Sequence, residues 1–134
     1  NLHNHSLAFA CPMCRKQGVE VTRTKETVEV VYSGDTVMSA LLPVEEVWQA
    51  RLLIMEVTYL EGSTSDAAKH QHIHVQDILD NVSRFSDTEQ LVIAHVSERH
   101  GHHRNILRTL ANTLPAKLIN KVHIILLHLP HFGI

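Results

Sequence analysis

Asp35 and His95 are residue types that bind metal ions, and each follows an apolar run. Asp35 comes after Val28–Tyr32 and a turn containing Gly34, where glycine gives the backbone freedom to bend. His95 comes directly after Leu91–Ala94. Carboxylate oxygens and imidazole nitrogens are both ligands of Zn²⁺. The alternative is that Asp35 caps a helix or turn, and that His95 is a hydrogen-bonded, half-buried imidazole.

Three further side chains could contribute to the same chemistry. His72 and His74 are two residues apart, so in an extended segment they share one face and form half of a possible metal site. The alternative for this pair is a solvated segment before a helix. Glu56 lies inside the apolar run Leu52–Thr58, where a carboxylate is rare unless it is paired or hydrogen-bonded. A position at a strand edge facing water is the alternative for Glu56.

Two other clusters carry weaker signals. Cys11 and Cys14 form a single CxxC pair, whereas a structural zinc site needs more ligands. His3 and His5 are the nearby candidates, and two free thiols are the simpler interpretation. The polar run His100–Arg104 is typical of a segment leading into a helix, although its cations could contact phosphate.

The elements that must position these side chains alternate along the chain. Strands are expected at Val28–Tyr32, Leu52–Thr58, Leu91–Ala94 and Val122–Leu127. Helices are expected near Pro43, from Val75 to Phe85, and from Ile106 to Leu114, where Pro115 follows. The order β-α-β-α-β-α-β indicates a layered α/β domain over 25–134, after an irregular segment over 1–24. Ligands of α/β sheets bind at strand ends.

Composition narrows the class of protein. The 134 residues are 44% hydrophobic and 19% charged, which is typical of one globular domain. A net charge of −2 and a pI near 6.7 lack the basic balance of most nucleic-acid-binding proteins. No apolar run reaches the roughly 18 residues of a membrane-spanning helix, and no secretory signal is recognisable. We therefore expect a cytoplasmic protein, with the nucleus also possible. The absence of an initial Met suggests a fragment.

Several short segments, taken in order, resemble motifs of one enzyme family. Ser33–Thr36 resembles a GDT motif, Met55–Thr58 a HEAT-type segment, and His72–His74 an HST-type motif. His95–Arg99 resembles HxSxRY, and Gln17–Thr22 resembles the stretch before the GDT strand. Together they resemble the C-terminal half of ribonuclease Z, in particular the short plant-type enzymes of the metallo-β-lactamase superfamily. The resemblance implies half of an αββα sandwich.

The resemblance also implies an activity and roles for particular residues. Ribonuclease Z is a zinc-dependent endoribonuclease that trims the 3′ end of precursor tRNA, with two Zn²⁺ per complete site, and it acts as a homodimer. By resemblance, Asp35 bridges the two metals and His95 is a terminal zinc ligand. His72 serves the leaving oxygen as a general acid, and we add Glu56 as its holding carboxylate. The expected phosphate or substrate contacts are Arg99, Ser97 and His74.

The sequence also departs from the family pattern. An HxHxDH motif, which supplies four ligands in the family, is absent, and His100 replaces the usual Tyr after Arg99. We therefore expect a truncated form that binds zinc weakly and has little activity alone. One alternative is a catalytically silent interaction module that pairs with a full-length subunit. Another is a different hydrolase of the same fold, such as an arylsulfatase-like or phosphodiesterase member.

Overall fold

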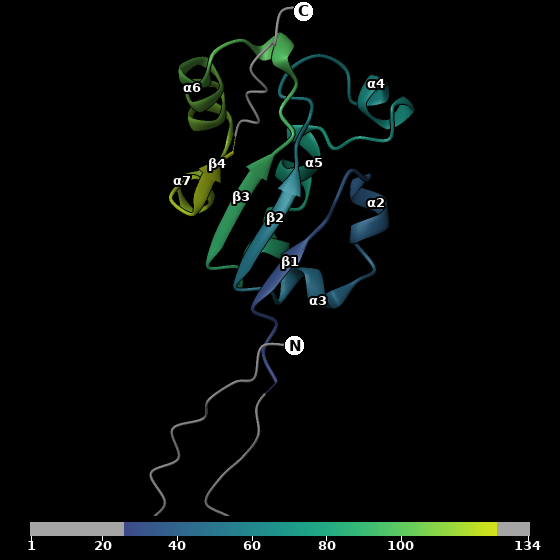
Figure 1. Cartoon of the computed structure of the whole chain (residues 1–134), viewed down its shortest axis with the longest axis vertical. Helices are drawn as coiled ribbons and strands as arrows, with labels where there is room; N and C mark the ends of the chain where they lie inside the picture. The colour runs from purple at the N-terminus through teal and green to yellow at the C-terminus, as the bar shows by residue number, and fades with distance from the viewer. Residues whose placement is uncertain (1–25, 126–134) are drawn as a thin grey trace, which may run out of the picture.

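The strands of this protein form one parallel sheet. A computed structural model describes residues 26–125. The sheet has the order β1-β2-β3-β4, and each neighbouring pair is parallel. The strands are β1 (Val30–Tyr32), β2 (Leu52–Glu56), β3 (Gln90–Ala94) and β4 (Val122–Ile124), shown in Figure 1. The predicted alternation of strands with helices in a mixed α/β fold is confirmed. The expected irregular segment 1–24 lies outside the described residues.

The helices that connect the strands are mostly short. They are α2 (Met38–Leu41), α3 (Glu45–Trp48), α4 (Thr64–Lys69), α5 (Val75–Asp80), α6 (His103–Thr113) and α7 (Ala116–Ile119), with 3₁₀ turns at Val82–Phe85 and Glu98–His100. Three of them, α2, α4 and α7, were not predicted, because segments of four to six residues contain too few turns to show a period.

Two predicted helices differ in detail from the structure. Pro43 lies before the N-cap Val44, so α3 begins at Glu45 and Pro43 is not in its first turn. The predicted helix from Val75 to Phe85 is α5 followed by a 3₁₀ turn. The α-helix ends where Asn81, with φ −123° and ψ 24°, leaves the helical region.

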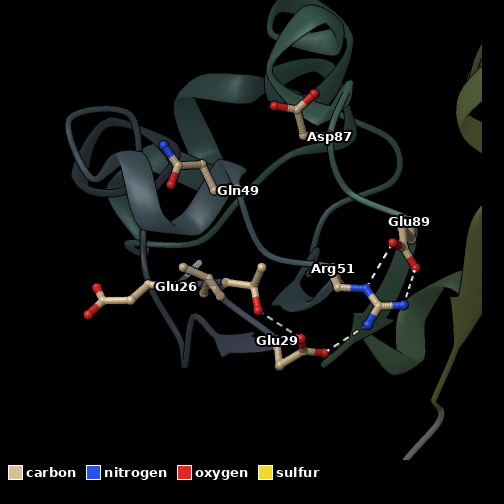
Figure 2. A pocket seen from close by; sticks show the side chains of 8 residues that line it. Glu26, Glu29, Gln49, Arg51, Asp87 and Glu89 are labelled. Atoms are coloured by element: carbon tan, nitrogen blue, oxygen red, sulfur yellow. Dashed lines mark hydrogen bonds and ion pairs between the residues drawn. The ribbon is translucent and has the colours of Figure 1, made fainter. Parts of the chain in front are cut away.

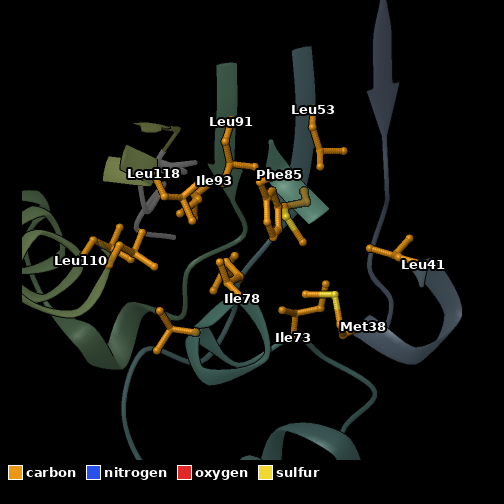
Figure 3. Packing of buried hydrophobic residues seen from close by; sticks show 14 of the residues in the cluster. Met38, Leu41, Leu53, Ile73, Ile78, Phe85, Leu91, Ile93, Leu110 and Leu118 are labelled. Carbon is orange, nitrogen blue, oxygen red and sulfur yellow. The ribbon is translucent and has the colours of Figure 1, made fainter. Parts of the chain in front are cut away.

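The hydrophobic core lies on one face of the sheet. Leu53 and Met55 of β2 and Leu91 and Ile93 of β3 are fully buried. These strand residues cluster with buried side chains of α5, α6 and α7, among them Ile78, Leu110 and Leu118 (Figure 3), and Trp48 of α3 belongs to the same cluster. Alternation along a strand therefore places every second residue of β2 and β3 against helices.

The opposite face of the sheet is much more accessible. Val30 and Tyr32 of β1 are 56% and 67% exposed, and Ile54 and Val92 are only partly buried. Tyr32 pairs with Ile54, and Ile54 with Val92, so these apolar side chains form a row across the sheet. We call Val30, Tyr32, Ile54 and Val92 the open face. Residues 26–125 thus supply one sheet with its helices on one side.

Candidate functional site

The carboxyl ends of β1, β2 and β3 meet at one edge of the sheet because the strands are parallel. The hydroxyl of Ser33, just after β1, accepts a hydrogen bond from the Glu56 N–H at 3.3 Å. The Val57 N–H donates to the Ala94 carbonyl at 3.1 Å, so the exits of β2 and β3 stay side by side. This edge carries the chain segments that contain Asp35, Glu56 and His95.

Glu56 is the buried centre of this edge, with 1% of its surface exposed. Its Oε1 accepts from the backbone N–H of Thr36 at 3.3 Å and of Ile73 at 3.0 Å. Its Oε2 accepts from the N–H and the hydroxyl of Thr58 at 3.0 and 2.9 Å. His72 Nδ1 lies 3.1 Å from Oε1. Both oxygens are occupied by donors, so the alternative of a water-facing strand edge is wrong.

His72 is oriented by this carboxylate. Because a carboxylate oxygen only accepts, the His72 proton belongs on Nδ1, and Nε2 is left with its lone pair. The preceding residue, Gln71, has φ +59°, a left-handed conformation that costs a residue with a side chain about 1–3 kcal/mol. The turn at Gln71 and the bond to Glu56 together fix where the His72 imidazole points.

His95 is held in a comparable way on the neighbouring strand end. It too has a left-handed φ, +54°, immediately after β3. Its Nδ1 lies 3.0 Å from the Thr58 hydroxyl and 3.3 Å from Asp35 Oδ1. Because the Asp35 carboxylate can only accept, the proton belongs on Nδ1 and Nε2 is left with its lone pair. Thr58 then links His95 to Glu56, since its hydroxyl donates to the Glu56 carboxylate.

These residues form a donor set that suits a metal ion. The His72 and His95 rings are 5.2 Å apart, and Glu56, His72 and His95 offer ligand atoms within 4.8 Å of one another. We assign Glu56 to the support of His72 rather than to a metal, because five donors already saturate its oxygens. The atoms that remain for a divalent cation are the Nε2 lone pair of His95 and the exposed carboxylate of Asp35, while the Nε2 of His72 stays available for proton transfer.

Arg99 and Ser97, predicted to contact phosphate, lie on the segment after His95. The Ser97 N–H donates to the Thr58 carbonyl at 3.1 Å, which ties this segment to the end of β2. The Arg99 guanidinium carbon is 3.9 Å from the centroid of the Tyr59 ring. Neither Tyr59 nor Thr58 was singled out from the sequence. Their positions two and three residues after Glu56 were the available signal.

His74, also predicted to contact substrate, has a different place in the structure. It is 6% exposed and is the N-cap of α5, where its Nδ1 accepts from the Gln76 N–H at 2.9 Å. Asp77 completes a capping box by accepting from the His74 N–H at 2.8 Å. Because its ring is buried as a helix cap, we do not include His74 among the proposed substrate contacts.

His100, where the family pattern has Tyr, is bound to the loop after β2. Its Nε2 accepts a hydrogen bond from the Leu60 N–H at 3.2 Å. Partial burial lowers the pKa of His100 below its ordinary value, and the neighbouring positive charge of Arg99 lowers it further.

A cavity of about 540 Å³ lies at the other edge of the sheet, where β2 begins. Arg51 is its central side chain and pairs with Glu89 at 2.8 Å and with Glu29 at 3.1 Å (Figure 2). The hydrogen bond and charge of Glu89 raise the pKa of Arg51, and the bond from Arg51 lowers the pKa of Glu89. This cavity is remote from the site residues.

The part of the chain that is described does not include four of the candidate ligands, Cys11, Cys14, His3 and His5.

Three curated proteins show what this chain is similar to, whereas no family model matches it. Two are tRNase Z proteins of Arabidopsis thaliana, one of them chloroplastic: they are 31% identical over 87 residues and 30% identical over 112 residues. These matches cover 62% and 81% of this chain and 31% of each relative. The ribonuclease Z of Macrococcus caseolyticus is 35% identical over 79 residues, 59% of this chain and 25% of that protein. The chain thus spans about a third or less of these relatives.

Within residues 26–125, no helix has the length and apolar character needed to span a membrane.

Proposed function

Because this chain belongs, over a partial region, to the ribonuclease Z family, we propose that it carries part of the active site of a tRNA 3′-processing endoribonuclease. The observation that carries this proposal is the Glu56–His72 pair beside His95 and Asp35 at the strand ends. The proposed substrate is precursor tRNA, and the reaction is hydrolysis of one phosphodiester bond.

We propose Zn²⁺ as the cofactor, with Asp35 and His95 as its ligands from this chain. The available Nε2 of His95 and the exposed oxygens of Asp35 fit an ion of this type. Bound zinc supplies a Lewis acid for phosphate oxygens and lowers the pKa of water. Catalytic zinc normally takes three protein ligands, so further ligands must come from another segment or another chain.

His72 acts on the leaving oxygen in this proposal. Its Nε2 carries a proton when the imidazole is charged, and that proton passes to the 3′ oxygen as the phosphorus–oxygen bond breaks. Glu56 accepts from Nδ1 at 3.1 Å and thereby holds the orientation of the ring. After the transfer His72 is neutral and recovers a proton from water. Arg99 and Ser97 are the proposed phosphate contacts.

The test is to co-express this chain with the N-terminal half of a short plant ribonuclease Z. Bound zinc and cleavage of a 3′-extended precursor tRNA are then measured. We expect Asp35→Ala to lose both metal and activity. His72→Ala should keep the metal and slow cleavage by about 10²–10⁴-fold, as for loss of a general acid. His74→Asn, which keeps a capping side chain, is the matched control and should cleave at the parent rate. Normal cleavage by His72→Ala would contradict the assignment.

A second candidate function follows from the open face. Exposed Val30 and Tyr32 on a sheet whose other face is buried suggest a surface that a second sheet covers, as in an αββα sandwich. The chain would then be a catalytically silent module that pairs with a full-length subunit, or would form the homodimer expected of the family. Zinc-free association with unchanged tRNA cleavage by the partner would favour this candidate.

A further inference from the structure

Arg99 has no acidic partner in the described part of the chain, unlike Arg51 and Arg84. Arg51 pairs with Glu29 and Glu89, and Arg84 pairs with Glu45. Within the described chain, the Arg99 guanidinium makes neither an ion pair nor a hydrogen bond. Its carbon instead lies 3.9 Å above the Tyr59 ring. A guanidinium stacked on an aromatic ring keeps its N–H donors, which point outward in its plane, free for a ligand.

Tyr59 is held firmly enough to position such a group. It is 8% exposed, its N–H donates to the Ile73 carbonyl at 3.2 Å, and its carbonyl accepts from the Val75 N–H at 2.8 Å. The segment that orients His72 therefore also fixes Tyr59. Its ring centroid is 6.3 Å from that of His72, so the stacked Arg99 lies beside the reactive site and not in it.

The Tyr59 hydroxyl is also anchored. His70 Nδ1 lies 2.8 Å from the Asp66 carbonyl and 3.1 Å from the Tyr59 hydroxyl oxygen. A carbonyl can only accept, so the proton is on Nδ1, and the hydroxyl accepts a share of it. The proton of the Tyr59 hydroxyl is then free to be donated.

We propose that Tyr59 is a positioning residue that holds Arg99 as the binding group for a second substrate phosphate, next to the one that His72 and His95 serve. The proposal rests on the proposed function and deepens it, since the site would then bind two consecutive phosphates of a nucleic-acid strand. Arg99 supplies charge and paired donors, which suit a phosphate, and Tyr59 keeps them directed.

The experiment compares two probes on the full chain: adenosine 5′-monophosphate and adenosine 3′,5′-bisphosphate, titrated by NMR. We expect the bisphosphate to bind about tenfold more tightly, the lower range for a charge-assisted contact. Arg99→Gln should remove that difference. Tyr59→Leu should reduce bisphosphate affinity by roughly 2- to 30-fold, the range for a lost cation–π contact, and should abolish the ring-current shift of the Arg99 side-chain protons.

Two controls separate positioning from general stability or charge. Tyr59→Phe keeps the ring and should retain both the shift and the affinity. Arg108→Gln removes the same charge from an exposed site on α6 and should leave both probes unaffected. If Tyr59→Leu fails to fold, Arg99→Gln, at an exposed position, still tests whether a second phosphate is bound. Equal affinities of the parent chain for the two probes would overturn the second subsite. Monophosphate binding that survives both His72→Gln and His95→Gln would instead contradict the proposed function.

Discussion

At the residue scale, Glu56 joins three parts of the chain that are distant in sequence. Its carboxylate accepts from Thr36, Thr58 and Ile73, and it holds the His72 ring. The sequence indicated the carboxylate, because a charge within an apolar strand needs a partner. It did not indicate Thr58, because threonine is common in strands and its hydroxyl carries no signal of its own.

His74 shows why the HIH spacing was ambiguous. His74 is itself extended, with φ −96° and ψ 148°, but as the N-cap of α5 it turns its ring toward the Gln76 N–H. The backbone of His74 also bridges to Tyr59, which draws this side chain into the fold. Pattern alone could not separate a ligand from a helix cap.

Glu56→Gln should destabilise the fold markedly. The amide places an N–H₂ where one carboxylate oxygen accepts from backbone donors, so at least one buried donor loses its partner. We expect the free energy of unfolding to fall by about 2–4 kcal/mol in urea denaturation. Glu46→Gln, at an exposed position of α3, should stay within roughly 0.5 kcal/mol of the parent. Equal effects of both changes would show that the Glu56 contacts carry little energy.

His100 should make stability depend on pH. Its folded pKa lies below the ordinary value of 6.5, so below pH 6.5 the unfolded chain binds more protons at this residue. Its contribution is complete above that value and is lost as pH falls toward the folded pKa. Urea unfolding of the parent and of His100→Gln between about pH 7.5 and 5 should show a smaller decline for the variant. Identical slopes would exclude a contribution from His100.

At the element scale, the sequence predicted the strands better than the helices. Runs such as Leu52–Thr58 and Leu91–Ala94 are buried on at least one face. Their apolar residues therefore identify them as strands whatever turns precede and follow them. The helices α2, α4 and α7 depend on tertiary packing of one or two side chains, such as Ala67 and Leu118. That packing is decided by the rest of the fold and leaves no periodic pattern.

The cap of α5 gives a prediction at this scale. His74→Ala removes the acceptor for the Gln76 N–H and should cost about 0.5–2 kcal/mol of stability. His74→Asn supplies a short side-chain acceptor and should recover most of the loss. Thermal unfolding followed by circular dichroism measures both variants. A loss in His74→Asn as large as that in His74→Ala would mean that burial of the ring, and not capping, is what stabilises α5.

At the scale of the whole molecule, the open face governs association. Tyr32→Lys places a charge in the row with Ile54 and Val92. If a second chain covers this row, sedimentation at micromolar concentration should shift from dimer to monomer. Leu107→Lys, on an exposed apolar position of α6, is the matched control and should not change the oligomer. A parent chain that sediments as a monomer would refute self-association through this face.

The strand order β1-β2-β3-β4 has a consequence for how the protein is made. Each new strand docks on the strand synthesised just before it, so no strand must wait at an unpaired position for a later one. Asp35, Glu56, His72 and His95 all precede α6 and β4 in the chain. The edge that carries these four residues therefore needs no strand pairing beyond β3, and β4 extends the sheet on the side away from β1.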